Sequence, residues 1–314
     1  MPCMTGKDMG SNDSLLRLLL AGQSVRGALL QATGLVRAMR IAHGLGVLES
    51  LVLGHACMAT LLIASSLKTG KERVSLQVEC SGPIRGLVAE ANGNGEVRGY
   101  LKQVPIPVTG PLDSFDLSPF FGAGFLSVSR YAGDGGQPFT GQVMLEHGNL
   151  AQDLSNYFLL SEQLPTALTL SVQFDRQGEV TGAGGLLLQA MPGASTELMA
   201  ELEQRLAVFP SLGTYLQGGG TMESLLAEQL AGFAPEVLDE TAVAFRCPCN
   251  RERMEAMLLT LPGPDLDDLR SNGPFPLAIR CHFCGTFHSF EQSALERLWQ
   301  ERQTEAVISA GRRS

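Results

Sequence analysis

The sequence is short of positive charge, of phosphate-binding motifs and of recognisable catalytic groupings. Its 23 lysines and arginines stand against 32 aspartates and glutamates, which gives a net charge of −9 and a pI near 5.1. Nucleic acid is therefore not an expected partner, because proteins that bind it present basic surfaces. No glycine-rich loop precedes Lys-Ser/Thr, and neither Ser161-Glu162 nor the five histidines form a recognisable triad. We expect a protein that is not an enzyme.

Export and membrane signals are also missing. The first thirteen residues are polar and lack the basic-then-apolar order of a secretory signal. The one long apolar run, residues 45–67, contains Glu49 and His55 and many small residues. We expect it to be a central helix in a soluble core and not a membrane span. Without an export signal the seven cysteines are expected to be reduced and the protein cytoplasmic.

Four of the seven cysteines fall in two short clusters near the C-terminus. These are Cys247-Pro248-Cys249 and Cys281-x-x-Cys284, with a long segment between them. Paired cysteines at such spacing, in a chain without an export signal, are typical of a zinc site with four thiolate ligands. Zinc is tetrahedral with sulfur about 2.3 Å away, so two short loops must each present two thiolates to one point. We expect one zinc ion bound by Cys247, Cys249, Cys281 and Cys284.

Neighbouring residues favour this geometry. Gly285 directly follows the second cysteine pair and tolerates the positive φ that a tight turn often needs. Pro248 stiffens the first pair and directs Cys247 toward an extended backbone. His282 and His288 are substitute ligands in principle, but four cysteines fill the shell, so we expect both to lie at the surface or beside the ligands. The alternative is two unrelated pairs of buried thiols.

Residues 14–193 have the pattern of one α+β domain. Helices are predicted at residues 34–43, 47–67 and 150–160. Strands are predicted at residues 25–32, 73–80, 84–90, 96–104, 125–131, 139–145, 168–174 and 180–189. Asn92-Gly93-Asn94-Gly95 is a strong hairpin signal. Strands joined by tight turns indicate a mainly antiparallel sheet with helices packed on it.

Pro192-Gly193 ends that domain, and residues 194–246 form a segment of another kind. This segment has eight acidic and two basic residues, and its apolar residues recur at helical spacing. A first short helix, stopped by Pro210, presents an apolar face. The face consists of Leu198, Leu202, Leu206 and Phe209. Thr221 can cap a second helix. Short helices depend on a partner surface, so we predict an amphipathic helical linker here.

Residues 247–314 are predicted to form a small zinc domain. Asn250 can cap a helix that ends at Pro262. Residues 275–280 and 286–290 resemble the two arms of a hairpin around the second cysteine pair, and a last helix begins near Gln292. The predicted division of the chain is therefore 1–193, 194–246 and 247–314.

Several sequence blocks together resemble one known family. In the C-terminal part they are Cys247-x-Cys249-Asn250-Arg251-Glu252-Arg253, Thr260-Leu261-Pro262 and Cys281-x-x-Cys284-Gly285. In the N-terminal part they are Glu72-Arg73-Val74-Ser75 with Gln77, Gly82-Pro83, Val97-Arg98-Gly99-Tyr100, Tyr157-Phe158 with Ser161-Glu162-Gln163, and Gly184-Gly185-Leu186-Leu187-Leu188-Gln189 before Pro192-Gly193. Over nearly its whole length the chain resembles the redox-regulated chaperones named for their 33-kilodalton heat-shock protein.

The resemblance implies a redox switch. Members of that family hold zinc through four thiolates when reduced, and oxidation forms disulfides, releases the metal and activates binding of unfolding proteins. They act without ATP and dimerise when active. For this chain the resemblance implies a holdase whose partners are unfolded client proteins and a second copy of itself, with no nucleic acid and no membrane.

Two further expectations concern this switch. Four cysteines allow three connectivities, and near neighbours meet far more often than distant ones once the metal leaves. We therefore expect disulfides Cys247–Cys249 and Cys281–Cys284. Structural zinc supplies about 10–16 kcal/mol of apparent folding free energy in small peptides, so metal loss should unfold residues 247–314. If this domain packs on the linker, its unfolding exposes a client-binding face. The candidate residues are Leu198, Leu202, Leu206 and Phe209.

The cysteines alone leave other functions open. A permanent structural zinc ribbon is the commonest use of such a site. A thiol-disulfide oxidoreductase could use Cys281-x-x-Cys284, although no thioredoxin-like βαβ pattern surrounds that pair. A zinc-ribbon nucleic-acid binder is disfavoured by the acidic composition. Zinc content before and after peroxide treatment separates the switch from the permanent ribbon.

Overall fold

The structure is a computed structural model of the 314-residue chain, and it describes residues 12–108, 110, 114, 116–133 and 136–311. The first eleven residues, where we predict no export signal, lie outside this description. Contacts divide the chain into two compact units with their boundary between Arg246 and Cys247. We call them the sheet unit and the cysteine unit. Residues 194–246 belong to the sheet unit, and their predicted role as a separate linker stays a prediction.

Sheet A of the sheet unit has the strand order β10-β1-β2-β9-β8. Its strands are β1 (Ser14–Leu20), β2 (Val25–Gln31), β8 (Thr166–Phe174), β9 (Val180–Ala190) and β10 (Glu236–Ala242). All neighbouring strands are antiparallel. Strand β10, the last strand of this sheet along the chain, therefore returns to pair with β1 and forms one edge of the sheet.

Sheet B has the order β11-β5-β4-β3-β6-β7. Its strands are β3 (Arg73–Cys80), β4 (Gly86–Asn92), β5 (Glu96–Leu101), β6 (Gly124–Tyr131), β7 (Phe139–Met144) and the short β11 (Ala244–Phe245). Neighbouring strands are antiparallel except β11 and β5, which are parallel. The β4–β5 hairpin turns at Gly95, whose φ of +79° a side chain would disfavour.

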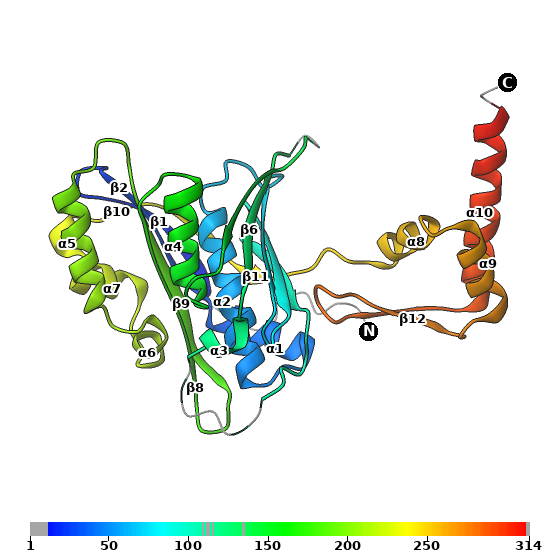
Figure 1. Cartoon of the computed structure of the whole chain (residues 1–314), viewed down its shortest axis with the longest axis horizontal. Helices are drawn as coiled ribbons and strands as arrows, with labels where there is room; N and C mark the ends of the chain where they lie inside the picture. Colours follow the sequence, from blue (N-terminus) through cyan, green and yellow to red (C-terminus); the bar gives the residue numbers. More distant parts are fainter. Residues whose placement is uncertain (1–11, 109, 111–113, 115, 134–135, 312–314) are drawn as a thin grey trace. The chain divides into compact units, whose positions relative to one another are not determined.

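Helices fill the space between the two sheets (Figure 1). They are α1 (Thr33–His43), α2 (Val47–Ala64) and α4 (Leu150–Ser161), and the single-turn helix α3 (Ser118–Phe121) lies nearby. By length and composition α2 could cross a membrane, but 89% of it is buried within the protein. It packs against strands of both sheets. The predicted central buried helix is thus confirmed.

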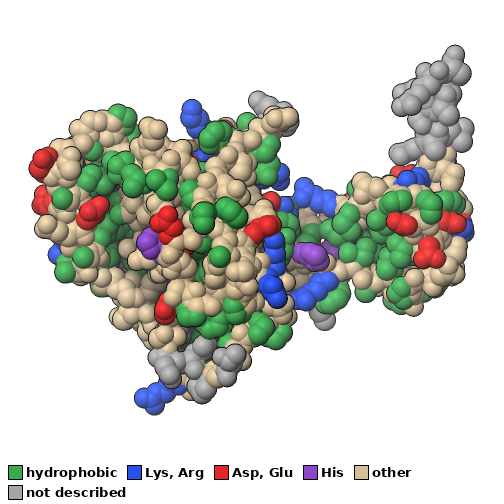
Figure 2. Space-filling view, viewed as in Figure 1, with side chains coloured by type: hydrophobic (Ala, Val, Ile, Leu, Met, Phe, Trp, Pro, Cys, Tyr) green, Lys and Arg blue, Asp and Glu red, His purple; other side chains and the backbone are tan. Residues whose placement is uncertain are grey.

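The outer face of sheet A is covered by a layer of short helices. These are α5 (Thr196–Ala207), α6 (Leu212–Gln217), α7 (Met222–Gln229) and the 3₁₀ turn η1 (Ala231–Phe233). Ser195 and Thr221 cap α5 and α7 with their side chains, which accept from Leu198 N and Ser224 N. The acidic side chains at the left of Figure 2 lie over this layer, so its outward surface is charged while its inward surface is apolar.

The cysteine unit combines a two-stranded hairpin with three helices. Its elements are α8 (Arg251–Leu259), α9 (Gly263–Asn272), β12 (Leu277–Arg280), β13 (Phe287–Phe290) and α10 (Gln292–Gly311). Its core is small. The buried side chains are Leu258, Leu266, Phe290, Ala294, Leu295 and Leu298. A core of this size supplies little stability by itself.

The predicted α+β class with mainly antiparallel sheets is confirmed, and so are the strands and helices predicted from alternation, turns and caps. The elements that were not predicted are β1, β10, the short β11, the one-turn helix α3, α6, the 3₁₀ turn η1 and α9. Strand β1 reads Ser-Leu-Leu-Arg-Leu-Leu-Leu, without period-two alternation, because leucines face a core on both sides of the sheet. Strand β10 contains three acidic residues, which are uncommon in strands.

Candidate metal centre

The first cysteine pair lies where the chain enters the cysteine unit. Cys247 follows Arg246, whose N–H donates to the Val97 carbonyl at the end of sheet B. Cys249 immediately precedes α8, and Asn250 caps that helix by accepting from Arg253 N at 2.9 Å. The predicted cap is therefore confirmed. It fixes the direction in which the backbone leaves the cysteine pair.

The second pair occupies the tight turn between β12 and β13. The Cys281 N–H donates to the Thr286 carbonyl at 2.8 Å, and the Gly285 N–H donates to the Cys281 carbonyl at 2.8 Å. Gly285 has a φ of +71°, the left-handed conformation expected from its position after Cys284. These bonds close the turn so that both cysteine side chains project to the same side of it.

The structure brings all four sulfurs together. The Sγ atoms of Cys247, Cys249, Cys281 and Cys284 all lie within 4.8 Å of one another. Cys247 Sγ is 3.8 Å from Cys281 Sγ, and Cys249 Sγ is 3.3 Å from Cys284 Sγ. A tetrahedron of sulfurs about 2.3 Å from a central zinc ion would have edges of about 3.8 Å. The spacing thus suits one tetrahedral ion with four sulfur ligands.

Burial and crowding determine how these thiols ionise. Burial, followed by the hydrogen bond with Cys284, raises the pKa of Cys249 to about 12. Hydrogen bonds with Cys247 and Cys284, together with burial, raise the pKa of Cys281. The pKa of Cys284 is lowered, because the neighbouring thiols Cys247 and Cys281 stabilise its thiolate. Cys249 and Cys281 therefore resist ionisation, and a bound cation would favour their thiolate forms.

The donor set is the soft, four-sulfur type that selects zinc or iron over magnesium or calcium. Three of the four cysteines are buried, and Cys249 is partly exposed. Neither His282 nor His288 belongs to the group of close donor atoms, as predicted. The four sulfurs therefore fit the zinc ion expected from the sequence, and they fit an iron ion as well.

Among the described residues, Cys57 and Cys80 lie apart from this cluster. Cys57 is buried on α2, and burial raises its pKa to about 12. Cys80 ends β3, is partly buried, and also has a raised pKa because of burial. Each lies outside the group of four cysteines, and a lone thiol that resists ionisation is a poor nucleophile. Both residues are therefore the inert thiols that their positions indicate.

The predicted client-binding residues are covered by the outer face of sheet A. Leu202 on α5 is only 1% exposed, and Leu198, Leu206 and Phe209 are partly buried beside it. They belong to a second hydrophobic core. The strand residues of that core are Leu16, Leu18, Leu20, Val25, Leu29, Leu186 and Leu188. Sequence reasoning proposed the cysteine segment as the cover of this face, whereas sheet A covers it in this structure.

Sequence reasoning also missed the connection between this helical layer and the cysteines. After η1 the chain forms β10 on the edge of sheet A, then β11 on the edge of sheet B, and only then reaches Cys247. Two ion pairs fasten this stretch, Arg17 with Asp239 and Arg246 with Glu96. A glycine at position 95 permits it, because a Cβ there would lie 2.3 Å from the Ala242 carbonyl oxygen. The glycine at position 95 is the feature of the sequence that marks this close approach.

Three comparisons with known proteins all point to the same family. A family model described as Hsp33 protein matches residues 13–291. Proteins named 33 kDa chaperonin from Geobacter sulfurreducens and Thermus thermophilus are 35% and 37% identical over 91% of this chain, and the alignments cover 94% and 86% of those relatives. The crystal structure of a 33 kDa chaperonin from Thermotoga maritima, a heat shock protein 33 homologue, matches with a TM-score of 0.84 and 30% identity. That match covers 94% of this chain and 100% of the other.

Proposed function

The chain belongs to the Hsp33 family of chaperones, and on this premise we propose that it is a redox-regulated holdase that binds unfolding proteins without ATP. The observation that carries the proposal is the cluster of four cysteine sulfurs within 4.8 Å of one another. The reduced chain, with zinc held by Cys247, Cys249, Cys281 and Cys284, is the inactive form. Oxidation of the same sulfurs produces the active form.

In the reduced form the four cysteines tie the β12–β13 turn to the start of α8. A bound zinc ion would neutralise the thiolates and cross-link the two pairs. The surrounding core has six buried side chains, Leu258, Leu266, Phe290, Ala294, Leu295 and Leu298. Because metal binding supplies much of the folding free energy of such small units, loss of the cross-link should unfold the cysteine unit.

Oxidation by a peroxide would proceed at a cysteine thiolate. The thiolate attacks one peroxide oxygen, and the O–O bond breaks to give a sulfenic acid and hydroxide. A second cysteine then attacks the sulfenic sulfur, forms the S–S bond and releases the hydroxyl as water. Two electrons leave each cysteine pair and reduce one peroxide. Four cysteines therefore consume two equivalents.

We propose that the disulfides are Cys247–Cys249 and Cys281–Cys284. In the folded cluster the sulfur contacts at 3.8 and 3.3 Å are crossed, Cys247 with Cys281 and Cys249 with Cys284, while all four sulfurs lie within 4.8 Å of one another. The local pairs follow from loop closure in the unfolded unit, where neighbours in sequence meet most often. Peptide mapping after peroxide treatment tests this, and a dominant Cys249–Cys281 bond would contradict it.

The active form also needs an exposed apolar surface that binds clients, and it is expected to associate with a second copy of the chain. The layer formed by α5–α7 is built of short helices, which depend on the sheet beneath them. Its release would expose leucines on both the helices and sheet A, including the predicted client-binding residues. Clients are unfolded or partly unfolded proteins in the cytoplasm, and the oxidised chain is expected to form homodimers, which size-exclusion chromatography with light scattering can detect.

The decisive experiment follows aggregation of a heat-denatured client by light scattering, with reduced and with peroxide-treated protein. A chromogenic chelator measures released zinc in the same samples. We expect suppression of aggregation only after oxidation, together with release of one zinc per chain. Equal suppression in both states, or full zinc retention in the active protein, would contradict the switch.

A thiol-disulfide oxidoreductase is the alternative that uses the same residues. The surroundings of Cys281-x-x-Cys284 argue against it, because the pair lies in the turn of a two-stranded hairpin and not at the start of a helix in a βαβ unit. The relatives are named chaperonins, which also favours a non-enzymatic role. Insulin reduction at a catalytic rate would support the enzyme instead.

A further inference from the structure

We propose that the edge of β1 receives a segment of the client as an added β-strand, in the position that β10 occupies in this structure. The inference rests on the proposed function, because β10 must leave before β1 becomes available. The client would bind at β1, by addition of a strand to the edge of sheet A. The occupant is an extended segment with apolar side chains at alternating positions.

Strand β1 has the properties of an acceptor strand. Leu15 faces the core between the sheets, while Leu16, Leu18 and Leu20 face the second core under the helical layer. All four leucines are at most 5% exposed. In the described part of the sheet unit, β10 is the strand paired with the outer backbone edge of β1, and it is the edge strand of sheet A. Without β10, β1 would present an unpaired backbone edge beside leucines on both faces.

Strand β10 is a chemically poor partner for β1. Glu240 lies directly opposite Leu16, and Glu236 lies opposite Leu19. The register also shifts between Arg17 and Leu18, which interrupts the regular ladder. A carboxylate opposite a leucine forgoes the cross-strand apolar contact that stabilises neighbouring strands. An apolar strand in the same place would therefore pair with β1 more favourably.

Few side-chain contacts hold β10 in place. Its ion pair joins Arg17 to Asp239, with Arg17 Nε donating at 2.8 Å, and these side chains remain 43% and 37% exposed. Exposed ion pairs of this kind contribute little stability. Val237 and Leu238 are 48% and 50% exposed. The strand is therefore held mainly by its backbone ladder with β1, and its covalent attachment keeps its local concentration high.

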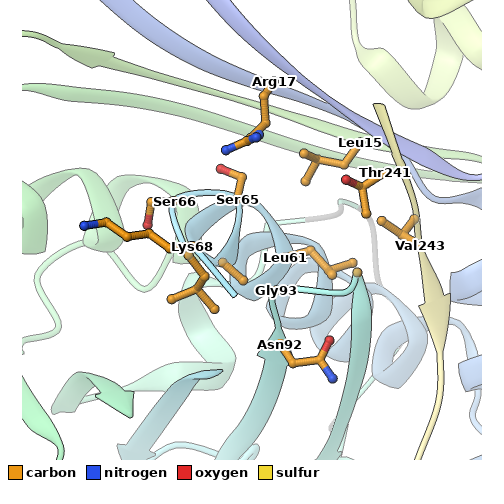
Figure 3. Close-up of a pocket in the computed structure, with 13 residues that line it drawn as sticks. Leu15, Arg17, Leu61, Ser65, Ser66, Lys68, Asn92, Gly93, Thr241 and Val243 are labelled. Carbon is orange, nitrogen blue, oxygen red and sulfur yellow. The ribbon is translucent and has the colours of Figure 1, made fainter. Parts of the chain in front are cut away.

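A cavity lies beneath the end of β10, where the chain leaves toward β11. Its volume is about 210 Å³. Leu15, Thr241 and Val243 line one side of it and Leu61 of α2 lines another (Figure 3). Atoms that border a cavity lack packing partners, so this end of the stretch is weakly packed. Separation of β10 from the sheet would begin here at low cost.

The structure also favours a client segment over other occupants. Strand β10 and helices α5–α7 belong to one continuous stretch, so its departure frees the β1 edge and the leucine face of sheet A together. A strand added to that edge gains backbone hydrogen bonds whatever its sequence, and its alternate side chains reach the leucine face. Strand β10 from a second copy would carry the same acidic mismatch. An apolar segment of an unfolded protein lacks that mismatch.

The main test uses a fluorescent eight-residue peptide with valine at alternate positions and lysine or threonine between them. Two further peptides carry backbone N-methyl groups, one on the odd and one on the even residues. In a strand these two sets of N–H groups point to opposite edges. With the apolar side chains of the peptide on the leucine face and the peptide antiparallel to β1, as β10 is, one set meets β1 and the other faces away from it. Anisotropy measures binding of all three to the full-length, peroxide-treated chain.

We expect one methylated peptide to bind at least about tenfold more weakly than the unmodified peptide, because it loses several backbone hydrogen bonds. The other should bind within about threefold of the unmodified peptide. Equal affinities of the two methylated peptides, at any level, would overturn strand addition and indicate binding through side chains alone.

A second test changes β10, the strand that would compete with the client for the edge of β1. Glu240→Val places a β-branched apolar side chain opposite Leu16, and Glu240→Gln removes the same charge without adding an apolar contact. Val should make β10 compete better, so the oxidised chain should bind the peptide up to about fivefold more weakly than the Gln variant. Equal affinities of the two variants would contradict competition at β1. If the oxidised wild-type protein suppressed client aggregation but both tests failed, only strand addition at β1 would be contradicted. If the oxidised wild-type protein did not suppress aggregation, the proposed holdase function itself would be contradicted.

Discussion

Single residues determine whether the four-cysteine cluster can bind a metal. The cluster combines two local devices, a capped helix that starts after Cys249 and a glycine turn that follows Cys284. Neither device holds a cation alone, since each presents only two sulfurs. The pKa values of Cys249 and Cys281 are raised, so the thiols resist losing their protons until a cation compensates. Metal binding is therefore coupled to proton release and weakens as pH falls.

We predict that Cys→Ser substitution at position 247, 249, 281 or 284 lowers zinc affinity by at least about a hundredfold, because each removes one of four ligands. Elemental analysis of purified, reduced protein measures this. The matched controls are Cys57→Ser and Cys80→Ser, whose thiols lie outside the cluster. Full zinc occupancy after loss of any one cluster cysteine would contradict the assignment.

His55 provides a residue-scale prediction about pH. Burial lowers its pKa to about 4, and its Nε2 has no hydrogen-bond partner among the described residues. The unfolded chain, with a histidine pKa near 6.5, then binds more protons than the folded chain between about pH 6.5 and 4. The free energy of unfolding should fall as pH decreases through this window, by up to about 1.4 kcal/mol per pH unit.

Urea unfolding of the wild type and of His55→Gln at several pH values measures this effect. The variant should lose most of the dependence in that window. His147→Gln, a substitution of an exposed histidine, should retain the wild-type dependence. Identical slopes for wild type and His55→Gln would show that His55 is not the responsible group.

At the scale of elements, the important arrangement is the helical layer on sheet A. Helix α5 is amphipathic, and its buried residue Leu202 packs with leucines of β1, β2 and β9. The same stretch continues into β10, so the layer is attached both by a face and by an edge. Detachment therefore has to overcome apolar packing as well as a strand pairing.

We predict that Leu202→Gln combined with Leu206→Gln loosens this layer in the reduced protein. Replacing the fully buried Leu202 alone should cost about 2–5 kcal/mol. Limited proteolysis should then cleave residues 194–246 faster than in the wild type. Val208→Gln is the matched control, because Val208 is 70% exposed and its change should be nearly neutral. Unchanged protection in the double variant would mean that another contact holds the layer.

The whole molecule consists of two units with very different cores. The sheet unit has two hydrophobic cores, one between its sheets and one under the helical layer, while the cysteine unit has a single core of six buried residues. Stability that depends on apolar burial is therefore concentrated before Arg246. We therefore expect the folding of the cysteine unit to depend on the chemistry of its four sulfurs.

Removal of metal from the reduced protein should accordingly unfold one unit and leave the other folded. We predict that a strong chelator removes hydrogen-exchange protection from α8, β12 and β13, while β2 and β9 remain protected. Mass-spectrometric exchange before and after chelation measures both units in one sample. If protection of α8 and of the hairpin survived full metal loss, zinc would not be what folds this unit.

The sequence by itself determined the features that depend on neighbours in the chain. Alternation, hairpin turns and helix caps predicted most strands and helices, and the cysteine spacing predicted the group of four sulfurs that the structure brings together. Such signals are reliable because each involves contacts within a few residues. Helical spacing also identified the apolar face of α5, and the short length of this helix predicted that another surface covers that face.

Only the tertiary structure decided what lies against what. It showed that sheet A covers the face of α5, that β1 is buried on both sides, and that the acidic stretch 236–242 is a strand on the edge of β1. The strand β10 has weak intrinsic preference for that conformation and acquires it from its partner, which lies more than two hundred residues away in the chain. A pairing over such a distance leaves no periodic signal in either segment, because the hydrogen bonds of a strand belong to its neighbour and not to its own sequence.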